Sequence, residues 1–173
     1  IVGESGSGKS VSSLAIMGLH NKARTKISGQ ITLHTKMGNT EIVSAEEEVV
    51  RKLRGKELAM IFQDPMTSLN PVYTIGSQIT EALLAHREMT KEEASAEAVR
   101  LLSLSGIPRP DEALDNFPHE FSGGMRQRAV IAIAMANNPK IMLADEPTTA
   151  LDVTVQAQVL QTLQKALDET HAA

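Results

Sequence analysis

The 173-residue sequence predicts an α/β fold with parallel strands and an inserted helical segment. Two observations support this prediction. Short apolar runs that are typical of buried strands alternate with longer segments whose apolar residues recur at helical spacing, a pattern that favours helices packed on a parallel sheet. Between residues 74 and 106 only the helical pattern is present, so we expect that this region is inserted into the layered core.

The first third of the chain is expected to contain a helix, a hairpin and a strand. Apolar residues from Val11 to Leu19 recur at helical spacing, which predicts a helix over about 9–20. Apolar and polar residues alternate before Gly38-Asn39, a pair that can form a turn, so we expect a β-hairpin over about 29–43. The short apolar run ELAMIFQ (57–63) is suited to a buried strand.

The middle of the chain is expected to be helical. Ile75, Ile79 and Leu83 fall on one face of a first helix. A second helix begins with the capping-box pair Thr90 and Glu93 and ends near Gly106. We therefore assign residues 64–121 to a helical subdomain.

The last third returns to the layered pattern. Ser122 can cap a helix that Pro139 ends, KIMLAD (140–145) is a further buried strand, and a last helix follows Asp152. Residues 1–63 and 122–173 are therefore expected to form one α/β core, with the hairpin attached to it.

Composition excludes several classes of protein. The net charge of −4 and the aromatic content of 2% disfavour a nucleic-acid-binding surface, so we expect no nucleic-acid partner. The sequence has no cysteine, which excludes a disulfide scaffold within these residues. Its longest apolar runs are far shorter than the roughly 18 residues that a membrane span requires.

The segment GESGSGKS (3–10) has the spacing of a phosphate-binding loop. Its glycines allow main-chain N–H groups to converge on phosphate oxygens, and the helix that follows directs its N-terminal dipole at the same anion. Lys9 adds a positive charge, and the Ser10 hydroxyl can ligate Mg²⁺. The alternative, a flexible Gly/Ser turn, is disfavoured because a strand remnant, the loop and a helix follow in the required order.

A matching carboxylate site follows a later strand. In IMLADEP (141–147), Asp145 and Glu146 come at the carboxyl end of the strand, the edge at which open parallel sheets bind ligands. Successive side chains of a strand point in different directions, so one acid can hold Mg²⁺ while the other activates a water molecule.

A third motif, FSGGMRQR (121–128), opens another helix with Ser122, Gly123 and Gly124. The same physics makes this helix N-terminus a second anion site. One phosphate chain rarely needs two such termini, so we expect that this site completes a nucleotide bound to another copy, arranged head to tail.

With these motifs the sequence resembles the nucleotide-binding domain of ABC transporters over nearly all of its length. GESGSGKS is similar to the Walker A loop, IFQDP to the Q-loop, FSGGMRQR to the family signature, IMLADEP to Walker B and TTALD to the D-loop. The signature departs from its commonest form at Phe121 and Met125. The sequence of these motifs is most similar to that of the ATPase subunits of bacterial oligopeptide, dipeptide and nickel importers. The resemblance implies a P-loop NTPase fold of ABC type with a RecA-like core.

The resemblance also implies roles for individual residues. ATP would be bound by Gly3, Glu4, Ser5, Gly6, Ser7, Gly8, Lys9 and Ser10 of the loop, by Ser122, Gly123 and Gly124 of the signature, and by Asp152 at the dimer seam. Glu146 would activate water, with Gln63 and Lys9 as further catalytic residues. Ser10, Gln63 and Asp145 would hold Mg²⁺.

The expected protein is the ATP-binding and ATP-hydrolysing subunit of an importer, located at the cytoplasmic face of the membrane. Its implied partners are a second ATP-binding subunit, membrane-spanning permease subunits and an extracytoplasmic solute-binding protein. In the family an aromatic residue before the phosphate loop stacks on adenine and a histidine ends the strand after the last helix. Neither is found here, since His171 reads as a tail residue, so we expect a piece of a longer domain with an incomplete sheet. The alternatives are a soluble ATPase of this type acting in DNA repair or translation, and a module that binds nucleotide without efficient turnover.

Overall fold

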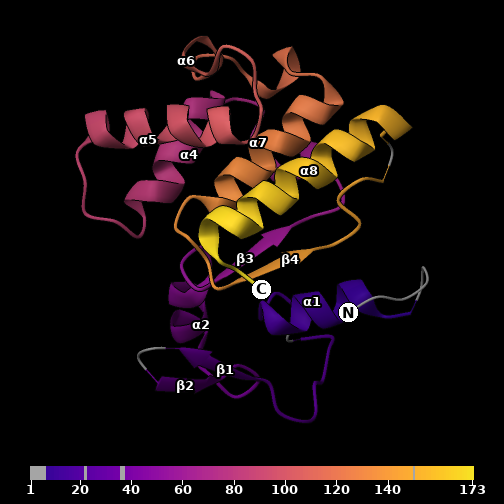
Figure 1. Cartoon of the computed structure of the whole chain (residues 1–173). Coiled ribbons are helices and arrows are strands. Elements are labelled where there is room, and N and C mark those ends of the chain that lie inside the picture. Colours follow the sequence, from indigo (N-terminus) through magenta and orange to yellow (C-terminus); the bar gives the residue numbers. More distant parts are fainter. Residues whose placement is uncertain (1–6, 22, 36–37, 150) are drawn as a thin grey trace.

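Two parallel strands lie at the centre of the molecule, between a large group of helices and a smaller group of elements. The computed structural model describes residues 7–21, 23–35, 38–149 and 151–173. Strand β3 (Leu58–Ile61) pairs with β4 (Ile141–Ala144), with Leu58 opposite Ile141 and Ile61 opposite Ala144. Most of the helices cover one side of this pair, and α1 (Lys9–Ile16) lies on the other (Figure 1). Both predicted strands and their parallel pairing are confirmed.

Helix α1 ends earlier than the sequence predicted. Gly18 takes a left-handed conformation with φ of 62°, in which a residue with a Cβ is strained. The Leu19 N–H donates to Leu14 O at 2.8 Å and the Gly18 N–H to Ala15 O at 3.1 Å, a pair of bonds that closes the helix. Leu19 therefore lies outside α1, and the predicted extent of 9–20 was too long.

The hairpin is present, but its turn is shifted. Strand β1 (Thr32–Thr35) pairs antiparallel with β2 (Gly38–Glu41), with Thr35 opposite Gly38. Gly38 and Asn39, which the sequence analysis placed in the turn, are the first paired residues of β2, and the connecting residues 36–37 lie outside the described residues. The turn prediction was wrong because a Gly-Asn pair suits an extended strand end as well as a turn.

A helix that the sequence analysis did not predict, α2 (Glu47–Leu53), follows the hairpin. It is only seven residues long, with Val50 buried and Leu53 partly buried, so its apolar periodicity is too short to identify a helix. Its first turn carries Glu47 and Glu48 and its last turn Arg51 and Lys52, the charge order that the helix dipole favours.

The expected helical region contains α3 (Pro65–Ser68), α4 (Ile75–Leu84), α5 (Lys91–Leu104), α6 (Pro110–Ala113) and a 3₁₀ turn (Pro118–Glu120). Ile75, Ile79 and Leu83 are fully buried along one face of α4, as the periodicity predicted. The capping box of α5 is also confirmed. The Thr90 N–H donates to Glu93 Oε2 at 2.7 Å, and the Glu93 N–H donates to Thr90 Oγ1 at 3.2 Å.

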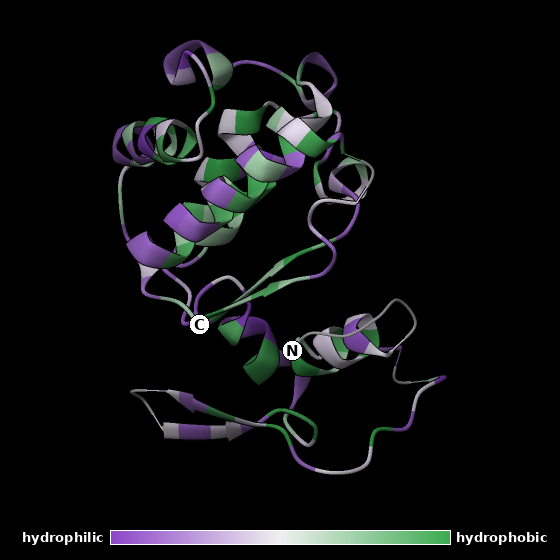
Figure 2. Cartoon of the chain, turned by 45° about the vertical axis from the view of Figure 1, so that its right-hand side comes forward, coloured by the Kyte–Doolittle hydropathy of each residue, from purple (hydrophilic) through white to green (hydrophobic). Residues whose placement is uncertain are grey.

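Helices α7 (Gly123–Met135) and α8 (Val153–Thr170) pack side by side across the same side of the strand pair (Figures 1 and 2). Ser122 Oγ accepts from the Met125 N–H at 3.3 Å, so its predicted N-cap is confirmed. Asp152 Oδ1 accepts from the Val155 N–H at 3.0 Å, which makes Asp152 the N-cap of the helix expected to follow it. Apolar residues of α7 and α8, among them Ile131 and Val159, belong to one core (both helices carry apolar and polar residues, Figure 2).

Side chains of β3 contribute to two apolar cores because alternate residues of a strand face opposite sides. Ala59 and Ile61 belong to the large core, which is built mainly by α4, α5, α7 and α8. Leu58 belongs to a smaller core with residues of the hairpin and α2, among them Leu33 and Val50. The large core combines residues from 64–121 and 122–173, and the division into an ATP-binding core and a helical subdomain stays a prediction.

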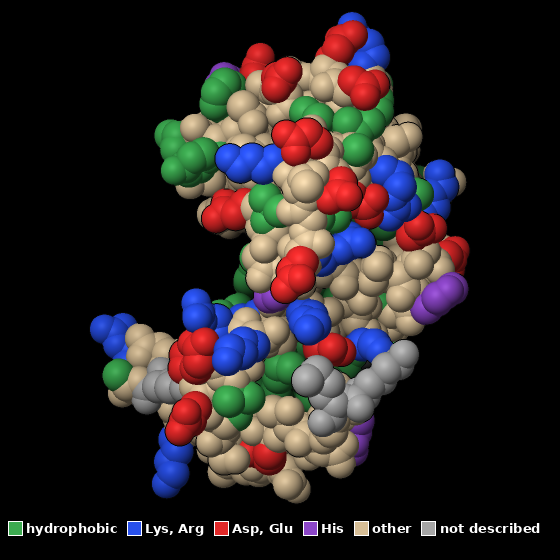
Figure 3. Space-filling model, turned by 90° about the vertical axis from the view of Figure 1, so that its left-hand side faces the viewer, with side chains coloured by type: hydrophobic (Ala, Val, Ile, Leu, Met, Phe, Trp, Pro, Cys, Tyr) green, Lys and Arg blue, Asp and Glu red, His purple; other side chains and the backbone are tan. Residues whose placement is uncertain are grey.

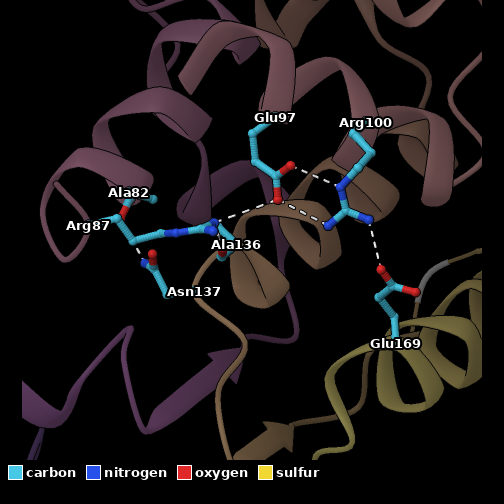
Figure 4. Close-up of polar contacts among 7 residues, drawn as sticks. All are labelled: Ala82, Arg87, Glu97, Arg100, Ala136, Asn137 and Glu169. Atoms are coloured by element: carbon cyan, nitrogen blue, oxygen red, sulfur yellow. Dashed lines mark hydrogen bonds and ion pairs between the residues drawn. The ribbon is translucent and has the colours of Figure 1, made fainter. Parts of the chain in front are cut away.

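Polar contacts tie α5 to α8 and α4 to the end of α7 (Figure 4). The Arg100 guanidinium lies 2.9 Å from Glu97 Oε2 and 2.7 Å from Glu169 Oε1, so one side chain bridges two carboxylates on different helices. The hydrogen bond from Arg100 lowers the pKa of Glu97. Asn137 Nδ2 donates to Ala82 O at 2.8 Å.

One face of the molecule is hollowed between the large helical group and the side that carries the hairpin (Figure 3). Lys, Arg and acidic side chains are intermixed on the hairpin side of this hollow (Figure 3). In the part of the chain that the structure describes, no helix is long and apolar enough to span a bilayer.

Candidate functional site

Two residues that are 135 positions apart meet at the carboxyl end of the strand pair. The Ser10 hydroxyl donates to Asp145 Oδ1 at 2.8 Å. Ser10 lies in the first turn of α1, and Asp145 directly follows β4, where its N–H extends the strand ladder by donating to Ile61 O at 2.9 Å. The predicted phosphate loop and the predicted carboxylate strand are therefore brought together by the fold.

Glu146 lies beside this contact in an unusual backbone conformation. Its φ of 47° is left-handed, a region that residues other than glycine seldom occupy and that is often held in place at functional sites. Glu146 Oε2 accepts from Gln63 Nε2 at 3.2 Å and from Thr149 Oγ1 at 3.2 Å. Gln63 comes two residues after β3, so the ends of both strands supply polar groups to one place.

Of the phosphate loop (3–10), the structure describes residues 7–10, which include the N-terminus of α1. Gly8 has φ of 89° and is the N-cap of α1, a conformation that favours glycine over other residues. Lys9 Nζ donates to Ser7 Oγ at 3.4 Å. Gly3, Glu4, Ser5 and Gly6, to which the sequence analysis also assigned nucleotide contacts, lie outside the described residues.

The chemistry of these groups suits a bound phosphate and a divalent cation. The N-terminus of α1 presents main-chain N–H groups and a partial positive charge, next to the Lys9 side chain. The hydroxyl of Ser10 and the carboxylate of Asp145 are hard oxygen ligands of the kind that Mg²⁺ prefers. The residues present therefore fit a Mg²⁺-bound nucleotide.

The residues of the third motif are placed elsewhere. Ser122, Gly123 and Gly124 lie at the start of α7, next to the residues that flank Asp152 at the start of α8. A Cβ on Gly124 would overlap Val155 Cγ1, and a Cβ on Gly123 would lie 3.6 Å from Leu151 Cδ2. Helices α7 and α8 lie on the opposite side of the strand pair from α1 (Figures 1 and 2).

Thr149 is a site residue that sequence reasoning missed. Its hydroxyl and Gln63 share the same oxygen of Glu146, and its N–H donates to Glu146 O at 3.1 Å, which closes a turn. The available signals were its place in the TTALD motif and its position three residues after Glu146. His171 is an exposed C-cap residue of α8 with φ of 52°. The expected tail is wrong for the residues that follow it, because the Met142 N–H donates to Ala173 O and the Ala173 N–H donates to Lys140 O, both at 2.9 Å.

A groove runs beside β3 and the start of the helical region. A pocket of about 450 Å³ is lined by Met60, Phe62, Thr67 and Val130, among others. An adjoining pocket of about 650 Å³ is lined by Tyr73, Gln78 and Glu81, and both pockets include Ser68 and Ile133. Several apolar side chains of this region are exposed: Phe62 by 36%, Met66 by 54% and Tyr73 by 55%.

Comparison with curated proteins gives closely similar relatives. The oligopeptide transport ATP-binding protein OppD of Bacillus subtilis (strain 168) is 55% identical over 172 residues, which cover 97% of this chain and 47% of that protein. The dipeptide transport ATP-binding protein DppD of Haemophilus influenzae is 53% identical over 164 residues, covering 94% of this chain and 48% of that protein. The chain spans about half the length of the curated relatives it matches.

Comparison with solved structures gives the same kind of protein. The ATP-binding cassette MJ0796, solved as a dimer in a post-hydrolysis state bound to ADP and Pi, matches with a TM-score of 0.80 and 29% identity. The match covers 98% of this chain and 68% of that one. This likeness confirms the expected P-loop fold of ABC type.

The family itself follows from the sequence match together with the geometry of the site. The family model described as "ABC transporter" matches residues 1–149, which is most of the chain. These residues include the phosphate loop and the paired acids that converge at the carboxyl end of the strands. The chain belongs to the ABC transporter family.

Proposed function

We propose that the protein is the ATP-binding and ATP-hydrolysing subunit of an importer for oligopeptides or dipeptides. The observation that supports this most strongly is the contact of Ser10 with Asp145, next to the contact of Gln63 with Glu146. Four residues from three distant segments supply one place with the groups that ATP hydrolysis needs. The peptide substrate is proposed from the names of the relatives OppD and DppD.

Each residue has a role in the proposed reaction. Lys9 and the main-chain N–H groups at the start of α1 bind the phosphates of ATP. Ser10, Asp145 and Gln63 hold Mg²⁺, which when bound neutralises charge on the phosphates. Glu146 accepts a proton from the attacking water, and a positioned base of this kind contributes about 10²–10⁴-fold to a rate.

Gln63 and Thr149 orient the base in this proposal. Both donate to the same oxygen of Glu146, which leaves the other carboxylate oxygen to accept the proton of water. The left-handed backbone of Glu146 directs its side chain differently from a regular strand continuation. In this way Asp145 can hold Mg²⁺ while Glu146, although adjacent, faces the attacking water.

A second ATP-binding subunit completes the site in this proposal. Ser122, Gly123, Gly124 and Asp152 lie across the strand pair from α1 and would contact the nucleotide of a partner subunit. The dimeric state in which the cassette MJ0796 was solved supports this arrangement. ATP binding then closes the dimer and hydrolysis reopens it.

The groove beside β3 is the proposed contact with a membrane-spanning permease. It is concave and partly apolar, its lining includes the exposed side chains of Phe62 and Tyr73, and Phe62 directly precedes Gln63. An amphipathic helix of the permease fits a groove of this kind. The chain would thus act at the cytoplasmic face of the membrane, together with a solute-binding protein outside it.

A mixing experiment with the full-length protein tests the proposal. Lys9→Ala and Ser122→Arg variants should each be inactive in ATP hydrolysis. In the mixed dimer, one site combines intact Lys9 with intact Ser122, so turnover should return on mixing. If the mixture is no more active than either variant alone, while the wild type hydrolyses ATP, the head-to-tail arrangement is wrong. If Lys9→Ala binds ATP as tightly as the wild type, the nucleotide site itself is wrong.

A further inference from the structure

Helix α1 carries the proposed nucleotide ligands at one end and is anchored at the other. None of its residues, Lys9–Ile16, is fully buried, and its apolar packing is concentrated at the C-terminal end, where Ile16 packs against the smaller core. At its N-terminus Ser10 contacts Asp145. Its C-terminus meets α2, where Met17 is buried and Gly18 lies against Val50: a Cβ on Gly18 would come within 3.0 Å of Val50 Cγ1.

Arg54, the residue that ends α2, holds this C-terminus. Its Nε donates to Met17 O at 2.7 Å and its Nη2 donates to Gly18 O at 2.9 Å. Its Nη1 forms an ion pair with Glu47 Oε1 at 2.8 Å. The side chain is only 20% exposed, so these contacts are partly shielded from water.

The geometry of a guanidinium explains why an arginine stands here. The last carbonyl groups of a helix have no partner within the helix and carry a partial negative charge. A guanidinium presents N–H groups in a rigid fork, which can bond two neighbouring carbonyl oxygens at once. Glu47 holds that fork in position from its other side. A lysine ammonium retains the charge but not the fork.

Arg54 also connects α1 to β3, the strand that Gln63 follows by two residues. It precedes β3 by four residues, it forms a parallel bridge with Leu58, and the N–H of the next residue, Gly55, donates to Leu58 O at 2.7 Å. The same short segment therefore fixes the far end of α1 and the start of β3. An eight-residue helix is only about 12 Å long and behaves as a rigid rod, so a shift at Met17 displaces Lys9 and Ser10.

We propose that Arg54 is a positioning residue for the nucleotide site. By holding the C-terminus of α1, it sets where Lys9 and Ser10 stand relative to Asp145. This inference rests on the proposed function, because it assumes that Lys9 and Ser10 bind Mg-ATP. It places a determinant of ATP affinity at the opposite end of the helix from the phosphates.

The test measures KM for Mg-ATP, kcat and the melting temperature for full-length Arg54→Ala and Arg54→Lys. Arg54→Ala should raise KM by about 10-fold to 100-fold, because a small misplacement of binding groups has effects of that size. Arg54→Lys should fall between Arg54→Ala and the wild type. Arg51→Ala is the matched control: Arg51 also lies on α2 and pairs with a glutamate, Glu48, but it is 68% exposed, and KM should not change.

A double-mutant comparison separates positioning from stability. If Arg54 acts through α1, Arg54→Ala should raise KM in the wild type but add little in a Ser10→Ala background. A variant that only unfolds more easily would lose active enzyme, and hence apparent kcat, with KM unchanged, and this result would overturn the inference. So would full additivity with Ser10→Ala.

Lys9→Ala keeps the two proposals distinguishable. Loss of Mg-ATP binding in Lys9→Ala together with a wild-type KM in Arg54→Ala would contradict the positioning role of Arg54 and leave the proposed nucleotide site in place. Unchanged Mg-ATP binding in Lys9→Ala would instead contradict the assignment of the nucleotide site, on which both proposals depend.

Discussion

Gly124 at the start of α7 lies so close to Val155 of α8 that a Cβ at this position would overlap Val155 Cγ1. The neighbouring Gly123 is different, since a Cβ there would make an ordinary contact of 3.6 Å with Leu151 Cδ2. The contact of Gly124 with α8 therefore leaves no room for a side chain, whereas Gly123 has space for one.

Gly124→Ala should lower the free energy of unfolding by about 1–3 kcal/mol, the usual cost of overpacking a tight contact. Gly123→Ala is the control and should change stability by much less. Denaturant unfolding of the two variants and the wild type measures the difference. Equal stability of Gly124→Ala and Gly123→Ala would contradict this account of the α7–α8 contact.

Thr149→Val should lower kcat for ATP hydrolysis by about tenfold and leave KM for ATP little changed. The valine keeps the shape of threonine but removes the hydroxyl that donates to Glu146 at 3.2 Å. The lost hydrogen bond goes to a carboxylate, so its removal corresponds to about 1.5 kcal/mol, or roughly tenfold in a rate. Thr148→Val is the adjacent control. A rise in KM without a fall in kcat would place Thr149 in ATP binding instead of in the orientation of Glu146.

Glu41 should make the stability of the hairpin region sensitive to acid. Its carboxylate accepts hydrogen bonds from the Ser44 hydroxyl and from the N–H groups of Ile31, Val43 and Ser44, which lower its pKa to about 2. Because the unfolded state takes up the proton first as the pH falls, this contribution is present above about pH 4.5 and is lost toward pH 2.

The measurement is the pH dependence of unfolding for Glu41→Gln and the wild type. The wild type should be the more stable at pH 7, and the difference should shrink between about pH 4.5 and 2. Glu46→Gln serves as a neighbouring control with a side chain that caps no helix N–H. A difference that stays constant over this range would refute the assigned cause.

Ser68→Arg should block the proposed permease contact. Ser68 lines both pockets of the groove beside β3, so a long charged side chain there would occupy the space shared by them. We expect unchanged ATP hydrolysis by the purified subunit but loss of co-purification with its permease. Ser103→Arg, on an exposed position of α5, should retain co-purification. Retention by Ser68→Arg as well would exclude this groove as the contact.

Arg100→Met should lower the free energy of unfolding by about 1 kcal/mol, since the side chain bridges carboxylates on α5 and α8 in a partly exposed setting. Added salt screens such pairs, so the loss should be smaller at 1 M salt. The control is Arg109→Met, whose ion pair with Glu112 lies on the surface within one helical turn. Equal effects of the two substitutions would show that the α5–α8 bridge adds nothing.

Most elements could be predicted from the sequence because their signals are local. The Thr90–Glu93 box, the Ser122 and Asp152 caps and the apolar runs of β3 and β4 each depend on neighbouring residues, and all of them are present. Helix α2 was missed because its seven residues are too few to show a helical periodicity, and the hairpin turn was misplaced because Gly38-Asn39 suits two conformations. The extent of α1 depended on Gly18, whose left-handed conformation ends the helix before Leu19.

The candidate site could be predicted only in part. Motif spacing identified Ser10, Asp145 and Glu146, and the family resemblance identified Gln63, but neither showed which of these residues contact one another. The convergence of Gln63 and Thr149 on one oxygen of Glu146 depends on a left-handed backbone at Glu146. No residue type in the sequence predicts that backbone conformation. The hydrogen bonds from Arg54 to the C-terminus of α1 depend on how α1 packs against α2. This packing is a long-range arrangement that no local sequence pattern predicts.

The ladder that joins the Asp145 N–H to Ile61 O also sets which side chains can meet at the end of the sheet. Gln63 follows Ile61 by two residues, so the alignment of the two strands decides that it reaches Glu146 and that Asp145 is left to Ser10. A slip of one position would turn every later side chain to the other face. The chemistry at this edge therefore depends on strand alignment as much as on the identity of its four polar residues. A substitution in the buried part of β3 that shifts this alignment would abolish the chemistry without changing any of the four.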